Sequence, residues 1–368
     1  MEFNPILPNN NIKKLPPIIN REDTDLLKKI NQANIALLEL KWSTQLLPDP
    51  MILINYISIK ESVDSNAIEN IHTTIESALL EEQTEISNRK KNEKEVINYK
   101  EGAIYWFNRV VINNGIMIND LVKINNIILE NDSWIITSPD KKIQVKETWE
   151  ILYTPPQWLS LIKSLCDNLE KFINNMDIWD DNDPIMKLPL IHYQFEAIHP
   201  FWDWNGRVWR ILIVLYLVLI NKLSYPILFL SEYIHHNKRD YYAHLNTIDR
   251  VWLWNSKDFS LWMFDAIIQQ SFKTKKIIDE IRELMYSTKN LIRKSKKIQW
   301  IYSKELLEYL FKSSIYSIQW LSDALNVHRN TASTYLKKME KEGICKKIKY
   351  KTYNFYINST YLELLTRK

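Results

Sequence analysis

The stretch HPFWDWNGRVWR, residues 199–210, gathers side chains that can do chemistry on a phosphate. His199 can take up a proton near neutral pH, and Asp203 offers a carboxylate to Mg²⁺ beside a polyphosphate. Arg207 and Arg210 lie three residues apart, so on a helix two guanidinium groups can converge on phosphate oxygens. A base, a metal ligand and paired arginines predict a site for phosphoryl or nucleotidyl transfer.

A helix must position these groups. The residues from 207 onward are helical in pattern and apolar enough to be buried, so the residues just before them should form the turn at its N-terminus. Backbone N–H groups point outward there, and the helix dipole favours anions. Taken singly, each residue also has a structural interpretation, because a lone histidine is more often a satisfied polar group and a helical arginine usually faces solvent.

The composition is that of a soluble globular protein, with 46% hydrophobic and 25% charged residues. A chain of 368 residues predicts two or three domains. The net charge of +4 is small, so any basic surface must be local. Cys166 and Cys345 are too few for a disulfide framework, and their spacing does not suggest zinc. The N-terminus lacks the apolar core of a signal peptide, and the longest apolar run is about half a membrane span. We therefore expect a cytoplasmic protein without a membrane partner.

Most of the chain has helical periodicity, which predicts a mainly α protein. Asp23 or Thr24 is a plausible N-cap for the first helix. Residues 142–156 instead alternate as two short extended runs joined by a turn, which predicts a β-hairpin. The helical stretches are expected near residues 22–41, 51–65, 93–110, 157–175, 186–221 and 257–290.

Beyond residue 300, three short helical segments precede a polar–apolar alternation at 346–357, which is the layout of a winged helix-turn-helix. Ala332, Tyr335 or Leu336, and Met339 would form the buried stripe of the third helix, and Gly343 sits where that helix should stop. The exposed face of this recognition helix would carry Arg329, Asn330, Ser333, Thr334 and Lys337.

The lysines of this segment do not decide which kind of partner it binds. Seven lysines could contact DNA phosphates through residues 305–357, although Glu340 and Glu342 interrupt them. The same module could recruit protein targets or join two chains as a homodimer. The lysines are Lys337, Lys338, Lys341, Lys346, Lys347, Lys349 and Lys351.

Residues 199–210 resemble the signature of the Fic family, H-x-F-x-(D/E)-G-N-G-R-x-x-R, and the match continues upstream in FEAIHPF. SNAIEN at 65–70 resembles the inhibitory motif of this family, (S/T)-x-x-x-E-(G/N). IQVKETWEILYTPP resembles its flap hairpin, which docks target peptides. The resemblance implies a Fic-fold helical bundle with a β-hairpin flap and a C-terminal winged helix-turn-helix domain. The expected divisions are 1–92, 93–290 and 291–368.

The resemblance also implies an activity. Fic adenylyltransferases transfer AMP from ATP, with Mg²⁺, to a Ser, Thr or Tyr hydroxyl of a target protein or of themselves. In this chain His199 would remove the hydroxyl proton, and Asp203 would hold the metal. Phe201 would anchor the loop in the core. Gly206 stands where Fic-fold kinases of the toxin branch carry lysine, which favours AMP transfer over phosphorylation.

The nucleotide-binding residues follow from the same resemblance. The backbone amides of 204–207, with Asn205, would cradle the phosphates, and the two arginines would neutralise the charge on leaving pyrophosphate. Tyr242 is a weaker candidate for a contact with adenine, since a packed helix tyrosine is an equally good interpretation. The full set is Trp204, Asn205, Gly206, Arg207, Arg210 and Tyr242.

Ser65, Glu69 and Asn70 form the inhibitory motif. Glu69 lies four residues after Ser65 and shares its helical face. The resemblance implies that Glu69 pairs with Arg210 and so withholds that guanidinium from the γ-phosphate; the alternative is a surface charge. The alternative function for the whole chain is a transcriptional regulator, in which the winged helix binds DNA and the Fic core only binds nucleotide or is inactive.

One feature of the composition is abnormal. Glycine occurs 4 times, where average usage predicts about 26. Tryptophan occurs 14 times. Several tryptophans stand where Fic proteins commonly carry glycine, namely Trp42, Trp149, Trp202, Trp204 and Trp209.

Three explanations compete for Trp204. The protein is an inactive relic, the loop tolerates an outward-pointing indole, or the tryptophans are not tryptophans. Some bacterial lineages read the codon UGA as glycine where other tables give tryptophan, and the abundance of Ile, Lys and Asn indicates an AT-rich gene. We favour the third explanation, which UGG codons at 204 and 209 would exclude.

Overall fold

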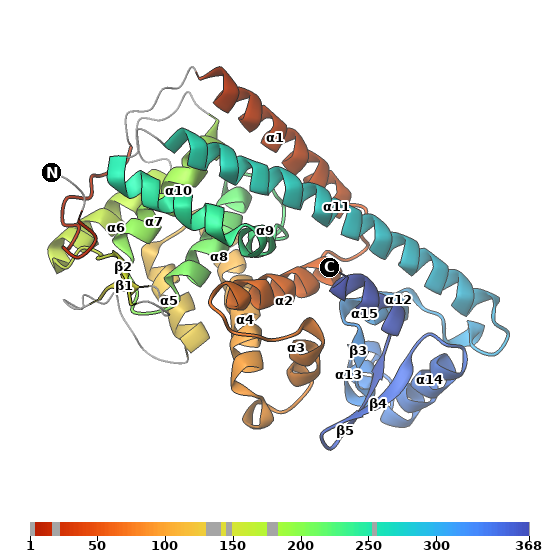
Figure 1. The fold of residues 1–368 in the computed structure, drawn as a ribbon. Coiled ribbons are helices and arrows are strands. Elements are labelled where there is room, and N and C mark those ends of the chain that lie inside the picture. The colour runs from red at the N-terminus through yellow and green to blue at the C-terminus, as the bar shows by residue number, and fades with distance from the viewer. Residues whose placement is uncertain are drawn as a thin grey trace. The chain divides into compact units, whose positions relative to one another are not determined.

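The computed structural model describes residues 4–16, 23–129, 141–144, 149–174, 183–251 and 256–367. The chain forms two compact units, Met1–Leu38 with Glu101–Gln270 and Glu39–Lys100 with Ser271–Lys368. The fold is mainly α-helical, as predicted, with two small antiparallel sheets (Figure 1). Three helices contribute residues to both units: α1 (Thr24–Thr44), α4 (Lys91–Asn113) and α11 (Ser256–Lys294).

The first unit is built around two helices that are buried on nearly all sides. They are α7 (Leu188–Ile198) and α8 (Asn205–Leu219), and they pack against each other. Their sequences are apolar all round, which is typical of a helix in the middle of a core. The remaining helices are α5 (Ile118–Leu129), α6 (Leu159–Ile173), η2 (Pro184–Lys187), α9 (Leu230–His236) and α10 (Lys238–Val251).

The helical stretch expected at 186–221 is interrupted in the structure. Residues 199–204 leave the helix and form the loop between α7 and α8. The helical periodicity does not run through these residues, and the turn predicted just before residue 207 lies here. His199 and Trp204 both adopt left-handed backbone conformations, which no helix interior accommodates.

A hairpin lies in the first unit where the sequence predicted one. Strand β1 (Ile143–Gln144) pairs antiparallel with β2 (Ile151–Tyr153), with Ile143 opposite Tyr153. Its turn, residues 145–148, lies outside the described residues. The hydroxyl of Tyr153 donates a hydrogen bond to the carbonyl oxygen of Ala197 at 2.8 Å, so the hairpin is tied to the end of α7.

The second unit combines N-terminal helices with the C-terminal module. Three helices followed by a two-stranded hairpin appear in the predicted order, and the sheet order is β3-β5-β4. The elements are α2 (Met51–Ile68), α3 (Ile75–Glu82), η1 (Ile86–Asn88), η4 (Gln299–Ile301), α12 (Lys304–Lys312), β3 (Ile315–Tyr316), α13 (Ile318–Leu325), α14 (Arg329–Lys341), β4 (Lys346–Tyr350), β5 (Tyr353–Ile357) and α15 (Ser359–Thr366).

The third of these C-terminal helices, α14, buries the stripe that the sequence predicted. Ala332, Leu336 and Met339 are fully buried, whereas Tyr335 is only half-buried. The periodicity allowed either Tyr335 or Leu336 in the buried stripe, and the structure places Leu336 there. Gly343 follows with a φ of 76° and ends the helix as a left-handed residue.

One apolar core joins the two parts of the second unit. Ile59 of α2, Leu79 of α3 and Val96 of α4 pack with Ile315 and Phe355 of the C-terminal sheet. Local sequence patterns do not reveal this shared core, because it joins residues far apart in the chain. The boundaries 1–92, 93–290 and 291–368 stay a prediction.

The structure shows how the chain manages with so few glycines. Four helix ends use asparagine in the left-handed conformation, at Asn70, Asn114, Asn221 and Asn326. Asparagine tolerates this region better than other residues with a side chain. At the start of α1, Asp23 rather than Thr24 is the cap, since its carboxylate accepts hydrogen bonds from the amides of Asp25 and Leu26.

Among the helices described, none combines the length and the apolarity that crossing a bilayer requires.

Candidate active site

The loop between α7 and α8 is closed by one buried amide. The Oδ1 of Asn205 accepts a hydrogen bond from the backbone N–H of Phe201 at 2.9 Å, and its Nδ2 donates to the carbonyl oxygen of Phe201 at 2.7 Å. Phe201 itself is buried, as expected of a core anchor. At the other end of the loop, the amide of His199 donates to the carbonyl oxygen of Phe195 and ends α7. The loop is therefore held at both ends.

The start of α8 offers only part of the predicted amide set. The amide of Trp204 donates to the Oδ1 of Asp203 at 2.7 Å, and that of Arg207 donates to the carbonyl oxygen of Trp204 at 3.0 Å. Asn205 and Gly206 occupy the first two positions of α8, where amides point away from the helix. These two amides are the ones that helix geometry directs toward an anion.

His199 lies beside a carboxylate and is largely shielded from water. Its Nδ1 is 3.6 Å from the Oε2 of Glu196, and the side chain is 14% exposed. Burial lowers the pKa of His199 below its ordinary value of 6.5, and the negative Glu196 partly opposes this while the positive Lys141 adds to it. The imidazole is therefore uncharged at neutral pH, which is the state that a general base requires.

Two residues that the sequence did not indicate also hold this loop. The ammonium of Lys141 donates to the carbonyl oxygen of Phe201, and the Nδ2 of Asn125 donates to that of Asp203 at 3.0 Å. Burial lowers the pKa of Lys141 to about 8, while Asp203 and Glu196 counteract that shift. Both residues lie far upstream of the loop, so its local spacing could not reveal them.

Both predicted arginines are buried at the start of α8 rather than exposed to solvent. The charge of Arg210 also reaches His192, whose pKa is lowered well below its ordinary value by burial and then by that arginine. Two guanidinium groups inside the protein favour a role with a buried anion over that of a solvated helix face.

Trp204 crowds this arrangement. Its side chain is 4% exposed, so the explanation of an outward-pointing indole was wrong. Its ring centroid lies 2.9 Å from the Cζ of Arg207, so the indole covers one face of that guanidinium group. The backbone at Trp204 has a φ of 72°, a region that bulky residues rarely adopt.

Trp209 has a different environment. It is fully buried, and its ring centroid lies 3.7 Å from that of His192 and 6.2 Å from that of Tyr241. The hydroxyl of Tyr241 is in turn 3.2 Å from the Nε2 of His192. Trp209 therefore belongs to an aromatic cluster under the loop and not to the anion-binding turn.

An apolar cavity adjoins the end of α7. Tyr242 of α10 forms part of its wall. Glu196 also lines it, and the same residue contacts His199. An apolar cavity with a few polar groups is typical of a small-molecule site. The other lining residues are Ile143, Leu152, Tyr153, Tyr193, Ala197 and Leu245.

Asp203 is exposed on the loop, where a carboxylate can reach a metal ion. The described residues contain no group of three or more His, Cys, Asp or Glu side chains that could hold a metal by themselves. Mg²⁺ that arrives with a nucleotide needs only one or two carboxylates, because phosphates and water complete its shell. A single exposed carboxylate therefore suits Mg²⁺ bound together with a polyphosphate.

The predicted inhibitory residues belong to the second unit. Ser65 is fully buried on α2, Glu69 caps the C-terminus of that helix, and Asn70 follows with a φ of 62°. This φ explains physically why glycine or asparagine suits the last position of the motif. The pairing of Glu69 with Arg210 stays a prediction.

Comparison with known families accounts for the arrangement. Three family models match the chain: "Fic/DOC family N-terminal" at residues 27–106, "Fic/DOC family" at 116–217, and "Protein adenylyltransferase SoFic-like, C-terminal domain" at 284–361. Together they cover most of the chain, and the second contains the whole of the 199–210 motif. The chain belongs to the Fic/DOC family. The SoFic-like match supports a transferase of the AMPylation type in general terms, and Fic adenylyltransferases use ATP to modify target proteins.

Solved Fic structures share this fold. A Fic family protein from Desulfovibrio desulfuricans G20 is 17% identical with a TM-score of 0.51, covering 94% of this chain and 98% of that one. A Fic domain containing signaling protein from Bacteroides thetaiotaomicron is 17% identical with a TM-score of 0.51, covering 70% of this chain and 97% of its own. Fic-1 from C. elegans is 18% identical with a TM-score of 0.50, with coverages of 70% and 73%. At these identities the likeness establishes the fold.

Proposed function

We propose that this Fic protein transfers AMP from ATP to a Ser, Thr or Tyr hydroxyl of a target protein, including itself. The observation that carries the proposal is the loop of residues 199–205. It joins a shielded histidine at the end of one buried helix to the N-terminus of a second buried helix, which bears two buried arginines. A base and an anion-binding turn within one short loop suit the attack of a hydroxyl on a phosphate.

His199 accepts the proton of the target hydroxyl, and the freed oxygen attacks the α-phosphorus of ATP. The new phosphorus–oxygen bond forms as the bond from the α-phosphorus to the bridging oxygen breaks, and pyrophosphate leaves. The amides of Asn205 and Gly206 bind phosphate oxygens, and Arg207 and Arg210 stabilise the negative charge of the leaving group. Mg²⁺, held through Asp203, would supply further charge neutralisation when bound.

The apolar cavity beside α7 is the proposed binding site of the nucleobase. Tyr242 and Tyr153 offer aromatic surface in its wall, and Glu196 joins the cavity to the base His199. Adenine is flat and mostly apolar, so we propose that it lies in this cavity. This supports Tyr242 as a nucleotide-binding residue.

Glu69 is the residue through which the proposed enzyme would inhibit itself. We propose that its carboxylate pairs with Arg210 and keeps that guanidinium from the γ-phosphate, with Ser65 and Asn70 completing the motif. The placement of Glu69 at the very end of α2, directly before a left-handed residue, supports a carboxylate held in a defined position.

Labelling of the full chain with radioactive ATP and Mg²⁺ tests the function. Auto-AMPylation should appear in the chain that carries His199 and disappear in His199→Ala. Mass spectrometry of the labelled protein should show an added AMP rather than a phosphate. A phosphate, or label that survives His199→Ala, would overturn the proposal.

The second candidate is a DNA-binding regulator, which the exposed face of α14 favours through Arg329, Asn330, Thr334 and Lys337. One lysine of the lysine-rich hairpin, Lys351, already binds a glutamate of α3. Salt-dependent gel shifts separate the two functions. They should use the full chain, because the C-terminal sheet shares its core with α2 and α3.

A further inference from the structure

Two tryptophans have backbones that suit glycine. Trp149 has a φ of 59° and Trp204 a φ of 72°, both in the left-handed region. A Cβ atom clashes with the following carbonyl oxygen in this region, which is why glycine dominates there and bulky side chains are outliers. Gly343, at a φ of 76°, adopts the same conformation. At four other such positions the chain uses asparagine.

The side chain of Trp149 is exposed to solvent, and that of Trp204 lies against a buried charge. Trp149 is 77% exposed. The ring of Trp204 lies against the guanidinium group of Arg207, the residue proposed to bind phosphate. By contrast, Trp106 is fully buried in an ordinary helix and is a normal core residue.

We propose that residues 149 and 204 are glycine in the protein as its own cell makes it, because UGA codons at these positions are read as glycine. The chain-wide deficit of glycine agrees with this, since 4 glycines stand where about 26 are usual. Glycine at 204 removes the ring from Arg207 and lets phosphate oxygens approach the backbone. This consequence for phosphate binding rests on the proposed function, whereas the identity of the residues does not.

The codons and the native protein decide this directly. We expect UGA at codons 149 and 204, and tryptic peptides from the source cells whose masses correspond to glycine at both positions. UGG codons, or peptide masses with tryptophan, would overturn the proposal.

Stability of the recombinant protein provides a second measurement. Trp149→Gly and Trp204→Gly should leave the melting temperature unchanged or raise it, because both relieve a left-handed backbone. The control is Trp320→Gly, an exposed tryptophan inside α13, which should lower the melting temperature because glycine weakens a helix interior. Equal losses in all three variants would contradict the proposal. Neither measurement depends on AMP transfer.

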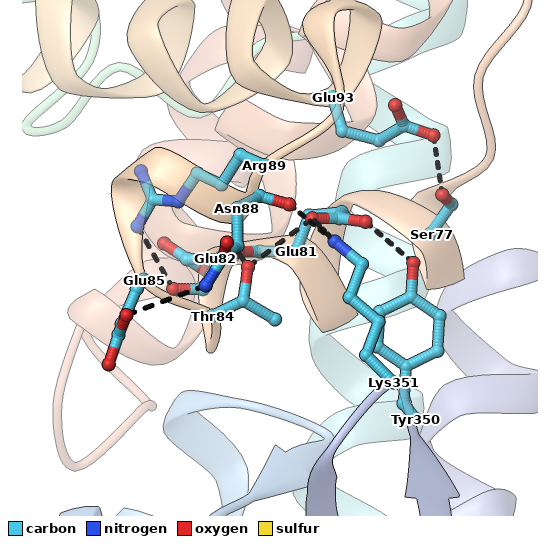
Figure 2. Close-up of polar contacts among 10 residues, drawn as sticks. All are labelled: Ser77, Glu81, Glu82, Thr84, Glu85, Asn88, Arg89, Glu93, Tyr350 and Lys351. Atoms are coloured by element: carbon cyan, nitrogen blue, oxygen red, sulfur yellow. Dashed lines mark hydrogen bonds and ion pairs between the residues drawn. The ribbon is translucent and has the colours of Figure 1, made fainter.

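A second inference comes from an independent observation in the other unit. The carboxylate of Glu81 on α3 is fully buried and accepts hydrogen bonds from the hydroxyl of Tyr350 at 2.6 Å and the ammonium of Lys351 at 2.7 Å (Figure 2). Lys351 also donates to the carbonyl oxygen of Asn88 at 2.6 Å. Both partners lie at the tip of the β4–β5 hairpin, which we call the wing. The tip of the wing is thus docked on α3.

The charges at this contact are coupled. Burial by itself would raise the pKa of Glu81, but hydrogen bonds from Lys351 and Tyr350 lower it below its ordinary value. Burial and the same carboxylate raise the pKa of Tyr350 to about 12. A buried carboxylate is stable only when it is paired in this way, so the wing and α3 depend on each other.

The docked helix directly follows the predicted inhibitory motif. Four residues, 71–74, separate Asn70 from the start of α3, and α3 packs against α2. On its other side α3 is tied to α4, because Glu82 pairs with Lys100 at 2.6 Å and Ser77 donates to Glu93 at 2.6 Å. The wing therefore completes the fixation of the segment that carries Glu69.

We propose that the wing is a latch: its docking on Glu81 holds residues 65–82 in place, and its release frees the inhibitory motif. The effect on AMP transfer rests on the proposed function. The effect on the order of residues 65–82 does not, so the two can fail separately.

Hydrogen exchange and auto-AMPylation of the full chain test the latch. Lys351→Ala and the milder Tyr350→Phe should increase amide exchange in residues 65–82 and raise auto-AMPylation severalfold. The matched control is Lys349→Ala, an exposed lysine of the same wing, which should change neither. In a Glu69→Gly background the wing variants should give no further increase in label.

Unchanged exchange at 65–82 in both wing variants would overturn the latch, whatever the label shows. Increased exchange with an unchanged rate of labelling would overturn its link to the inhibitory motif. Absence of label even in Glu69→Gly with glycine at position 204 counts against the proposed function instead, and the exchange result still decides the latch.

Discussion

At the scale of single residues, the proposed AMP transfer depends on the charge state of His199. Because burial lowers its pKa below 6.5, the imidazole stays neutral to a lower pH than an ordinary histidine. The rate of AMP transfer should therefore fall only when the pH drops below 6.5. Glu196→Gln removes a charge that raises this pKa, so the acid limb of the pH–rate profile should move to still lower pH.

The pH–rate profile of auto-AMPylation measures both effects. Asp167→Asn, an exposed carboxylate on α6, serves as the control and should leave the limb where it is. If the acid limb of the profile lies above pH 6.5, or if Glu196→Gln shifts it to higher pH, a group other than His199 controls the rate.

Asn205 and Asn174 allow a matched comparison at the same scale. Each side chain both accepts from and donates to the backbone of a second residue, Phe201 and Ile116 respectively, and Asn174 also donates to the carbonyl oxygen of Glu170. Replacing either by alanine should lower the free energy of unfolding by about 1–3 kcal/mol. Only Asn205→Ala should also weaken ATP binding, because of the two residues only Asn205 shapes the loop that we propose binds phosphate. Chemical denaturation and calorimetric titration with ATP measure the two effects, and equal affinities in both variants would contradict this role.

At the scale of elements, the β1–β2 hairpin, α7 and α10 together enclose the cavity proposed for adenine. Tyr242→Ala should raise the KM for ATP severalfold and leave kcat nearly unchanged, because a contact with the base is the same in the ground and transition states. Steady-state labelling measures both constants. Tyr286→Ala, an exposed tyrosine on α11, is the control, and a fall in kcat alone would assign Tyr242 a different role.

The end of α2 is the element that sets the predicted inhibition. Glu69→Gly should raise auto-AMPylation at least severalfold, since it removes the carboxylate that we propose competes with the γ-phosphate for Arg210. Glu69→Gln should act in the same direction, because it removes the charge while it keeps the size. The double variant with His199→Ala should give no label. If neither single variant gains radioactive label, Glu69 is a surface charge without an inhibitory role.

At the scale of the whole molecule, the C-terminal module is a structural part of the unit that holds α2 and α3. Ile315, Phe355 and Ile357 cover Leu79 and Leu80 in their common core. A chain truncated after residue 290 should therefore lose amide protection in α2 and α3 and bind a hydrophobic dye. Ile315→Ala in the full chain should show a weaker form of the same change, at a loss of about 2–5 kcal/mol. Full protection of α2 and α3 after truncation would show that the two parts fold independently.

The sequence by itself determined the elements and the identity of the motif. Helices α1, α2, α4, α6 and α11, the hairpin and the α12–α14 order follow from local periodicity and caps, which act within a few residues. The motif chemistry also lies within twelve consecutive residues. These are local properties, so one sequence is enough to read them.

Only the tertiary structure decided what surrounds the motif. It buried both arginines, and it brought Lys141 and Asn125 to the loop carbonyls. It also joined the wing to α3 and gave Trp149 and Trp204 their left-handed backbones. The physical reason is that these contacts join residues far apart in the chain, and packing of the whole unit, not local spacing, selects which of them meet.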